Sequence, residues 1–404
     1  MKITFRFYGM RLLIGIGLLL FVFTSCSNDD EVPPPAPISY TTLIYMMADN
    51  SMDSEVDYCI SQLKEGAKHS AGTAVVYIDR MNEAPRLFKI TQAGEEVALK
   101  SYDDESSATV ETLAQVIEDT KKLAPSNKFG LILWSHAMGW LPWHYSSNIR
   151  SASNHKERTF PYTRYIGYDT HPGNSANSTV TMTVDKLADA LPDNVAEYIW
   201  FDACLMGSVE VMYELRNKCN YLVASPTEVL AEANYDASGI PYSKVLPYLF
   251  GSKEKLTQAC KIYFNHYNGM KYDVLRTATI ALVDAAELDR LHDTVHGILG
   301  GHLNEVGNMD VNGLQAYHTD KIPHVFFDFT DVLNHLKGTN AILEAQMKRT
   351  VIYKATTDQI INKLTINKDK FSGLSVYVPL AKWKTNPEYE YYFSSVEWSD
   401  VYNK

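Results

Sequence analysis

Cysteine is scarce in this sequence, with 5 in 404 residues. So few cysteines exclude a fold held together by a disulfide framework. No two of them are spaced as CxxC, which also excludes a zinc ribbon and a thioredoxin-like redox motif. Cys59 and Cys260 fall within helical patterns and are expected to be small buried side chains. Among the four cysteines after Cys26, only Cys204 has neighbours that suggest chemistry.

Several catalytic and nucleotide-binding motifs are also absent. The sequence has no Gly-x-Ser-x-Gly elbow, no P-loop and no dinucleotide fingerprint, which excludes the usual serine hydrolases and nucleotide-binding proteins. His292 and His296 are four positions apart on an expected helix, with His302 beyond them, but no HExxH motif or carboxylate partner accompanies them. We therefore expect solvent-exposed histidines there and predict no metal site.

Positively charged residues are in the minority. The sequence has 37 Lys and Arg but 48 Asp and Glu, which gives a formal net charge of −11. An acidic surface repels phosphate backbones, so we expect no nucleic-acid partner and an electrostatic preference for cationic groups. With 46% hydrophobic and 21% charged residues, the chain is globular. Its length fits two to three units, or one large α/β domain with additions.

Long apolar runs are missing except near the N-terminus. There, an uncharged stretch at 12–23 is too short for a comfortable membrane span and follows three basic residues, Lys2, Arg6 and Arg11. It runs into Ser25-Cys26 and resembles the lipobox of bacterial lipoproteins, although Phe23 stands where an aliphatic residue is usual. We predict a lipoprotein signal peptide over 1–25 with lipidation of Cys26, and ordinary secretion is the alternative.

Residues 26–40 are acidic and rich in proline, so they are expected to form an extended tether. Acidic residues directly after a lipidated cysteine resemble the surface-export signal of Bacteroidetes lipoproteins. We therefore expect an exported protein, held at the outer membrane by its N-terminal lipid and exposed at the cell surface.

Short apolar runs alternate with helical patterns along the rest of the chain. Continuous apolarity predicts doubly covered strands at 42–47, 73–78, 129–134, 198–201, 221–224, 277–283 and 374–378. Helical spacing predicts helices at 52–68, 107–123, 184–190, 207–217, 286–299 and 328–336. This alternation predicts an α/β fold with a mostly parallel sheet covered by helices on both faces.

Two of the expected strands deliver a histidine and a cysteine to one edge of that sheet. His136 follows the strand at 129–134 and Cys204 follows the strand at 198–201, and chemistry gathers beyond the carboxyl ends of parallel strands. An imidazole, or the N-terminus of a helix starting near Gly207, would raise the thiolate fraction of Cys204. Residue types alone favour a buried cysteine and a hydrogen-bonded histidine, whereas the flanking residues favour a catalytic pair.

Those flanking residues resemble a known family. The block YIWFDACLMG at 198–207 resembles the nucleophile motif of clostripain-like cysteine peptidases, which belong to the caspase-like clan. The block LILWSHAMGW at 131–140 resembles the family's histidine motif. Further similarities are YMMADN at 45–50, GIPY at 239–242 and GLSVYVP at 373–379. The resemblance extends from about Thr41 to the C-terminus.

The resemblance implies a caspase-like α/β/α sandwich at 41–245, with a C-terminal α/β part at 246–404 packed on it. Cys204 would be the nucleophile that forms a thioester, and His136 the general acid and base of a dyad. Hydrolysis would follow Arg or Lys, with Asp202 binding the basic P1 side chain; helix capping or strand-end hydrogen bonding is the other interpretation of Asp202. Partners would be protein or peptide substrates with basic residues, and we expect a monomer.

No cofactor is required by this interpretation. Some relatives use calcium, and the acidic run at 103–105 would be the candidate ligand set, but a solvated loop is the simpler expectation. Relatives are often activated by self-cleavage between the histidine and cysteine strands. The long polar segment at 141–179 carries Arg150, Lys156 and Arg158, which we rank above Arg164 as cleavage sites.

One residue departs from the family pattern. Glycine usually follows the histidine and offers its N–H to the oxyanion, whereas this chain has Ala137. Alanine keeps that donor unless the turn requires a positive φ, in which case the oxyanion site of Ala137 and Cys204 would be impaired. The alternative function is therefore a catalytically impaired surface lipoprotein that binds glycan or peptide. The aromatic stretch at 383–402 would serve such a binder, although core packing explains it more simply.

Overall fold

The computed structural model describes residues 39–103, 105–141, 166–169, 180–317 and 324–404. Residues Ile38–Lys404 form one compact unit. Cys26, the predicted signal peptide and the candidate processing residues Arg150, Lys156, Arg158 and Arg164 lie outside the described residues. Within the described ranges, no helix combines the length and the apolarity that a membrane span needs.

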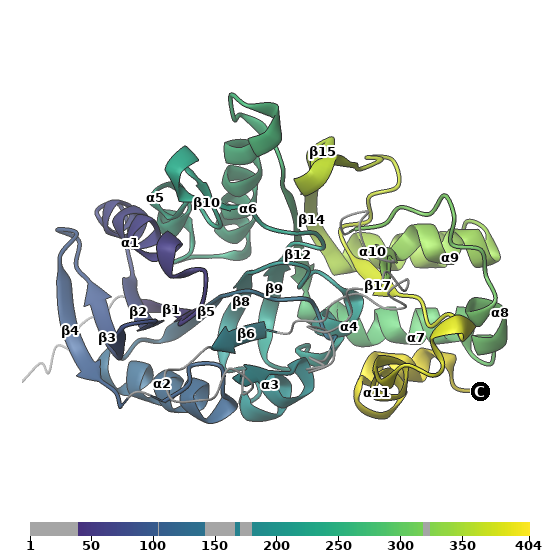
Figure 1. Ribbon diagram of the computed structural model, residues 1–404, viewed down its shortest axis with the longest axis horizontal. Helices are drawn as coiled ribbons and strands as arrows, with labels where there is room; N and C mark the ends of the chain where they lie inside the picture. The colour runs from purple at the N-terminus through teal and green to yellow at the C-terminus, as the bar shows by residue number, and fades with distance from the viewer. Residues whose placement is uncertain (1–38, 104, 142–165, 170–179, 318–323) are drawn as a thin grey trace, which may run out of the picture. The chain divides into compact units, whose positions relative to one another are not determined.

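A central sheet organises the fold. In the described residues it has nine strands in the order β14-β12-β9-β8-β5-β1-β2-β3-β4 (Figure 1). Their bounds are β1 (Tyr40–Ala48), β2 (Thr73–Arg80), β3 (Glu83–Ile90), β4 (Glu96–Ser101), β5 (Lys128–Trp134), β8 (Ala196–Asp202), β9 (Cys219–Ala224), β12 (Thr279–Asp284) and β14 (Val351–Thr356).

The middle of this sheet is parallel and its margins are antiparallel. Strands β9, β8, β5, β1 and β2 pair in parallel, whereas β3 and β4 on one side and β12 and β14 on the other pair antiparallel. The predicted mostly parallel sheet is confirmed. The pattern did not predict β3, β4 and β14. Strands β2, β3 and β4 follow one another through short turns, and such connections permit only antiparallel neighbours.

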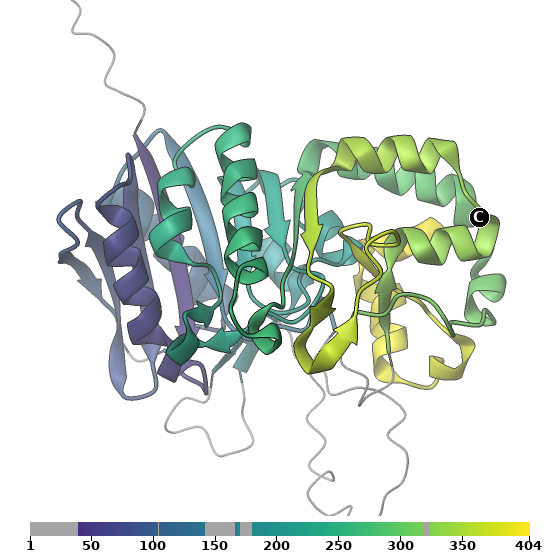
Figure 2. The same cartoon turned by 90° about the horizontal axis from the view of Figure 1, so that it is seen from above.

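Helices cover both faces, which explains the continuous apolarity of the central strands. One face carries α1 (Asp53–Ala67), α5 (Tyr242–Val245) and α6 (Lys253–Asn268), and the other carries α2 (Val110–Leu123), α3 (Val184–Ala190), α4 (Val209–Glu214) and α7 (Leu288–Leu299). Seen from above in Figure 2, purple α1 and green α6 lie over the same face. Each face has its own hydrophobic core, and β1 is buried along its whole length. The three layers confirm the predicted α/β/α class.

The chain beyond residue 245 contributes strands both to the central sheet and to small two-stranded sheets. Its strands β12 and β14 extend the central sheet, and the residues on both sides of position 245 belong to the same compact unit. The strand predicted at 374–378 exists as β17 (Ser375–Tyr377), but it pairs with β13 (Phe326–Asp328) outside the central sheet. Besides α6 and α7, the helices described in this part are α8 (Leu303–Gly307), α9 (Phe329–Lys337), α10 (Ala341–Thr350) and α11 (Pro387–Ser395).

Smaller elements complete the described chain. Two-stranded ribbons join β6 (Ile166–Asp169) to β7 (Val180–Met182), β10 (Ala231–Glu232) to β11 (Ala237–Ser238) and β15 (Gln359–Ile360) to β16 (Leu364–Thr365). Short 3₁₀ helices span Ala233–Tyr235, Leu246–Tyr248, Asp273–Leu275, Ala285–Glu287, Ile361–Lys363, Ala381–Trp383 and Glu397–Tyr402.

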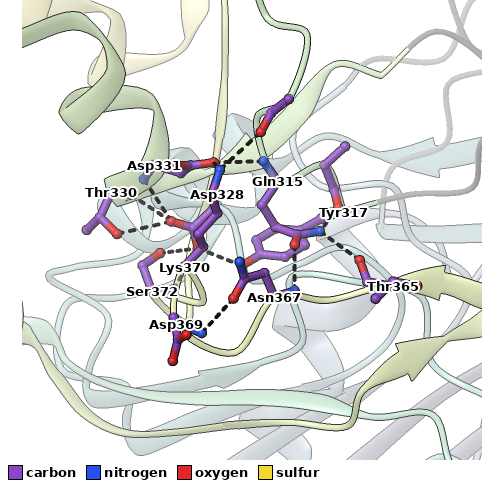
Figure 3. A network of polar contacts seen from close by, with 12 residues as sticks. Gln315, Tyr317, Asp328, Thr330, Asp331, Thr365, Asn367, Asp369, Lys370 and Ser372 are labelled. Carbon is purple, nitrogen blue, oxygen red and sulfur yellow. Dashed lines mark hydrogen bonds and ion pairs between the residues drawn. The ribbon is translucent and has the colours of Figure 1, made fainter.

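A buried carboxylate holds the C-terminal part together (Figure 3). Asp328 is fully buried, and it accepts hydrogen bonds from the Tyr317 hydroxyl at 2.6 Å and from the Ser372 N–H and hydroxyl at 2.6 and 2.7 Å. Its other oxygen caps α9 by accepting from the N–H groups of Thr330 and Asp331, both at 3.0 Å. Burial raises the pKa of Asp328, and these donors oppose that shift. One side chain thus joins β13, α9 and the loop before β17.

Candidate active site

The turns after β5 and β8 lie side by side. Trp134 pairs with Asp202 in the parallel register, and the Ser135 N–H donates to the Asp202 carbonyl at 3.4 Å. His136 and Cys204 each stand two residues beyond this last pair, so one edge of the sheet receives both. Both residues are partly exposed.

Cys204 differs from the other described cysteines. Cys59, Cys219 and Cys260 are buried, and burial raises the pKa of each thiol, that of Cys219 to about 12. The Cys204 sulfur instead receives the backbone N–H of Val229 at 3.3 Å and lies 3.7 Å from the carbonyl oxygen of the same residue. The N–H directed at the sulfur favours the thiolate, which is the nucleophilic form of cysteine, whereas the hydrogen bond from the thiol to the carbonyl favours the protonated form.

The turn after Cys204 is held against the chain that follows β9. Leu205 has a φ of 60°, an uncommon value for a residue with a side chain, and its N–H donates to the Thr227 carbonyl at 2.9 Å. The Gly207 N–H donates to the Ser225 carbonyl at 2.8 Å. The helix predicted from Gly207 begins only at Val209 and has 6 residues. The Val229 N–H is a donor that the structure directs at the sulfur.

His136 contacts a residue that sequence reasoning missed. The Ser51 hydroxyl lies 2.9 Å from the Nε2 atom of His136, and the Gly167 N–H donates to the His136 carbonyl at 3.1 Å. Ser51 follows β1, the strand next to β5. The rule that led to His136 and Cys204, inspection of residues just beyond a strand, would also have found Ser51.

Ala137 occupies its turn without a positive φ. The positive value in this segment belongs to Gly139, at 63°, where an added Cβ would lie 3.1 Å from the Leu205 carbonyl oxygen and 3.1 Å from the Phe326 ring. Glycine is thus required at 139 rather than at 137. Among the contacts of the described residues, no hydrogen bond occupies the Ala137 N–H, so the alanine retains a donor for a developing oxyanion.

Asp202 is buried next to the site, with 4% of its surface exposed. Its Oδ2 accepts from the Ile240 N–H at 3.1 Å and from the Tyr242 hydroxyl at 2.9 Å. Burial raises its pKa to about 6, and these two hydrogen bonds oppose that shift. Gly239, with a φ of 57°, passes so close that a Cβ there would come within 2.5 Å of Oδ1. The GIPY segment therefore packs directly on this carboxylate.

The structure does not support the other candidate sites. His292 is not a solvent-exposed residue as expected, because its side chain is only 14% exposed and stacks on Tyr213. In the aromatic C-terminal stretch, Tyr392, Trp398 and Tyr402 are buried in the core, whereas Tyr389, Tyr391 and Phe393 are partly exposed. Within the described residues no group of three or more His, Cys, Asp or Glu side chains could hold a metal ion. Asp104, in the acidic run at 103–105, lies outside that range.

Comparison with known proteins agrees with this geometry. The sequence model described as the clostripain family matches residues 44–401. A solved structure described as an inactive zymogen C11 protease from Parabacteroides distasonis is 28% identical, with a TM-score of 0.74 over 91% of this chain and 99% of that one. A secreted C11 cysteine protease from Bacteroides thetaiotaomicron, solved with an irreversible peptide inhibitor, is 24% identical, with a TM-score of 0.72 over 90% and 98% of the two chains. No curated protein matches the chain.

Proposed function

The chain belongs to the clostripain family and is a cysteine peptidase, and we propose that it cuts proteins and peptides after Arg or Lys through a dyad of His136 and Cys204. One observation carries the proposal. The register of β5 and β8 delivers a partly exposed imidazole and the one partly exposed thiol of the described chain to the same sheet edge. A thiol and an imidazole placed in this way form a nucleophile and a general acid.

The proposed reaction has two steps and needs no cofactor. The Cys204 thiolate attacks the scissile carbonyl, and His136 protonates the departing amine, which leaves a thioester on the enzyme. His136 then takes a proton from water, and the resulting hydroxide attacks the thioester, which releases the acid and restores the thiolate beside the protonated His136. The N–H groups of Ala137 and Cys204 would hold the oxyanion in both steps. The Val229 N–H supports the thiolate before attack.

Asp202 is the proposed partner of a basic P1 side chain. Its carboxylate lies two residues before the nucleophile, and a buried carboxylate attracts a guanidinium or ammonium group more strongly than an exposed one does. A cation bound there would favour the ionised form of Asp202, whose pKa burial raises to about 6. Cleavage after Arg should therefore weaken as the pH falls through this value.

Export and anchoring are further proposals. We expect removal of residues 1–25 and lipidation of Cys26 at the outer membrane, in line with the secreted relative from Bacteroides thetaiotaomicron. Replacement of Cys26 by Ser should abolish the lipid-dependent mass increase and release the chain from membranes.

Self-cleavage would use Arg150, Lys156 or Arg158. Their joint replacement by Gln should leave the chain in one piece on a gel, whereas the Arg164→Gln variant should still be cut.

The test of the proposed function compares the wild type with two variants, each of which lacks a different cysteine. The wild type, Cys204→Ala and Cys219→Ala are incubated with fluorogenic peptides ending in Arg, Lys, Asp or Leu. Cleavage should be confined to the Arg and Lys peptides, absent in Cys204→Ala and retained in Cys219→Ala, whose cysteine is buried. Absence of cleavage by a folded wild type would refute the proposal.

Specificity is tested separately with Asp202→Asn. The amide oxygen still accepts from Ile240 and Tyr242, so the variant should fold with an unchanged melting temperature. Its kcat/KM for Arg peptides should fall by about tenfold or more, since a charge-assisted pair with the guanidinium is lost. An undiminished preference for Arg would place the P1 acid elsewhere.

A further inference from the structure

Three neighbouring strands end at the edge that holds the proposed dyad. The sheet order places β8, β5 and β1 side by side, with Trp134 paired to Asp202 on one side and to Met46 on the other. Cys204, His136 and Ser51 follow these strands in turn. Ser51 therefore reaches the imidazole from the side opposite to the nucleophile strand, and its hydroxyl lies 2.9 Å from Nε2.

Hydrogen bonds fix the backbone around Ser51, although Ser51 itself is exposed. Asn50 is buried, donates through Nδ2 to the Met47 carbonyl at 2.9 Å and accepts the Met52 N–H at 2.9 Å. The Asp53 N–H donates to the Asn50 carbonyl at 3.0 Å, and α1 begins at Asp53. Ser51 thus sits between a fully buried strand and a helix start, and this rigid setting can hold a partner side chain in place.

We propose that Ser51 is a positioning residue for the reaction, acting through His136. This inference rests on the proposed dyad. A hydroxyl can accept the proton of Nε2–H, which fixes the ring plane and the tautomer of the imidazole that exchanges protons with Cys204 and the leaving amine. The same acceptor stabilises the imidazolium ion that pairs with the thiolate. The Ser51 hydroxyl thus stabilises the charged form of His136, as the Val229 N–H stabilises the charged form of Cys204.

The experiment compares Ser51→Ala with Ser51→Thr and with Ser54→Ala in the full chain. Ser54 is the matched control, because its hydroxyl donates to the Ser51 carbonyl at 3.4 Å within the same turn. Ser51→Ala should lower kcat by about tenfold with little change in KM, since general acid–base catalysis loses its orientation. The alkaline limb of its kcat/KM profile should move to lower pH, because the imidazolium has lost an acceptor. Ser51→Thr should restore both properties, and Ser54→Ala should match the wild type.

A second readout keeps this inference separate from the proposed peptidase activity. The thiolate of Cys204 is titrated by ultraviolet absorbance and by its alkylation rate with iodoacetamide, each measured against Cys204→Ala. Ser51→Ala should narrow the pH range in which the thiolate–imidazolium pair exists, even if no peptide is cleaved. Titrations and pH profiles identical to those of the wild type would overturn the role of Ser51, and so would a loss that Ser51→Thr fails to rescue.

Discussion

Ala137 stands where relatives of this chain are expected to carry glycine. The φ angle of this residue decides whether alanine strains the backbone of the proposed oxyanion site. Its φ is not positive, whereas that of Gly139 is 63°. Alanine therefore costs no backbone strain and keeps its N–H. The impaired oxyanion site considered from the sequence has no basis in this geometry.

We accordingly expect Ala137→Gly to leave kcat/KM within about threefold of the wild type, well below the change that loss of an oxyanion donor causes. The free energy of unfolding of the variant should be lower by roughly 0.5–1 kcal/mol, because glycine has more backbone freedom in the unfolded chain. Steady-state kinetics and urea denaturation check these two results. A gain of a hundredfold in rate would mean that the alanine does strain the oxyanion site.

Asp79 is another residue whose surroundings determine its chemistry. It lies in β2 with 1% of its surface exposed, and the Ser107 N–H donates both to it at 3.2 Å and to the buried Asp169 at 2.8 Å. Burial, and then the negative charge of Asp169, raise the pKa of Asp79 to about 8. The folded chain thus keeps a proton on Asp79 that the unfolded chain loses near pH 4.

This shift makes stability fall as the pH rises. Between about pH 4 and pH 8 the unfolded state is ionised at Asp79 and the folded state is not, so this carboxyl lowers the free energy of unfolding progressively as the pH rises through that range. Asp79→Asn cannot ionise and should be more stable than the wild type at pH 8 but similar at pH 4. Urea denaturation at several pH values measures this, with the exposed Asp293→Asn as control. Parallel curves for the wild type and Asp79→Asn would contradict the assignment.

Among the elements, the turn between β11 and α5 shows how glycine permits close packing. Gly239 lies against the Asp202 carboxylate with a φ of 57°. Gly297, inside α7, has no atom within 4 Å of an added Cβ. Substitution at Gly297 therefore serves as the control for substitution at Gly239.

Gly239→Ala should destabilise the fold by about 1–3 kcal/mol, because the new methyl group strains the backbone and pushes Asp202 aside. Gly297→Ala should stabilise the fold by roughly 0.5–1 kcal/mol through helix propensity alone. Thermal denaturation of both variants measures the contrast. If Gly239→Ala melted at or above the wild-type temperature, the close approach to Asp202 would be disproved.

The ribbon of β13 and β17 supports the nucleophile turn from outside the central sheet. The Ser375 N–H donates to the Gly207 carbonyl at 3.0 Å, and the Tyr377 N–H donates to the buried Glu210 carboxyl at 2.7 Å. Phe326 of β13 packs against the turn that carries Gly139. Both turns of the site therefore depend on residues far beyond position 245.

For the molecule as a whole, this dependence predicts the effect of truncation. A chain ending at Val245 loses β12 and β14 and exposes the edge of β9. It also loses the helices and the ribbon that complete the core on the α2 side. We expect this fragment to be insoluble or unfolded by circular dichroism, whereas the complete chain is folded. A soluble fragment with native-like thermal unfolding would show that residues up to 245 fold independently.

The sequence by itself determined the layered α/β class and brought His136 and Cys204 to one edge, because buried parallel strands are continuously apolar and their carboxyl ends gather together. It did not determine the hydrogen bond between Ser51 and His136, or that from the Val229 N–H to the Cys204 sulfur, since neither residue type is distinctive and both partners are distant along the chain. Nor did it show that Gly139, rather than position 137, needs a positive φ. Contacts across the fold also joined the C-terminal part to the central sheet, because local periodicity cannot tell which strands will pair.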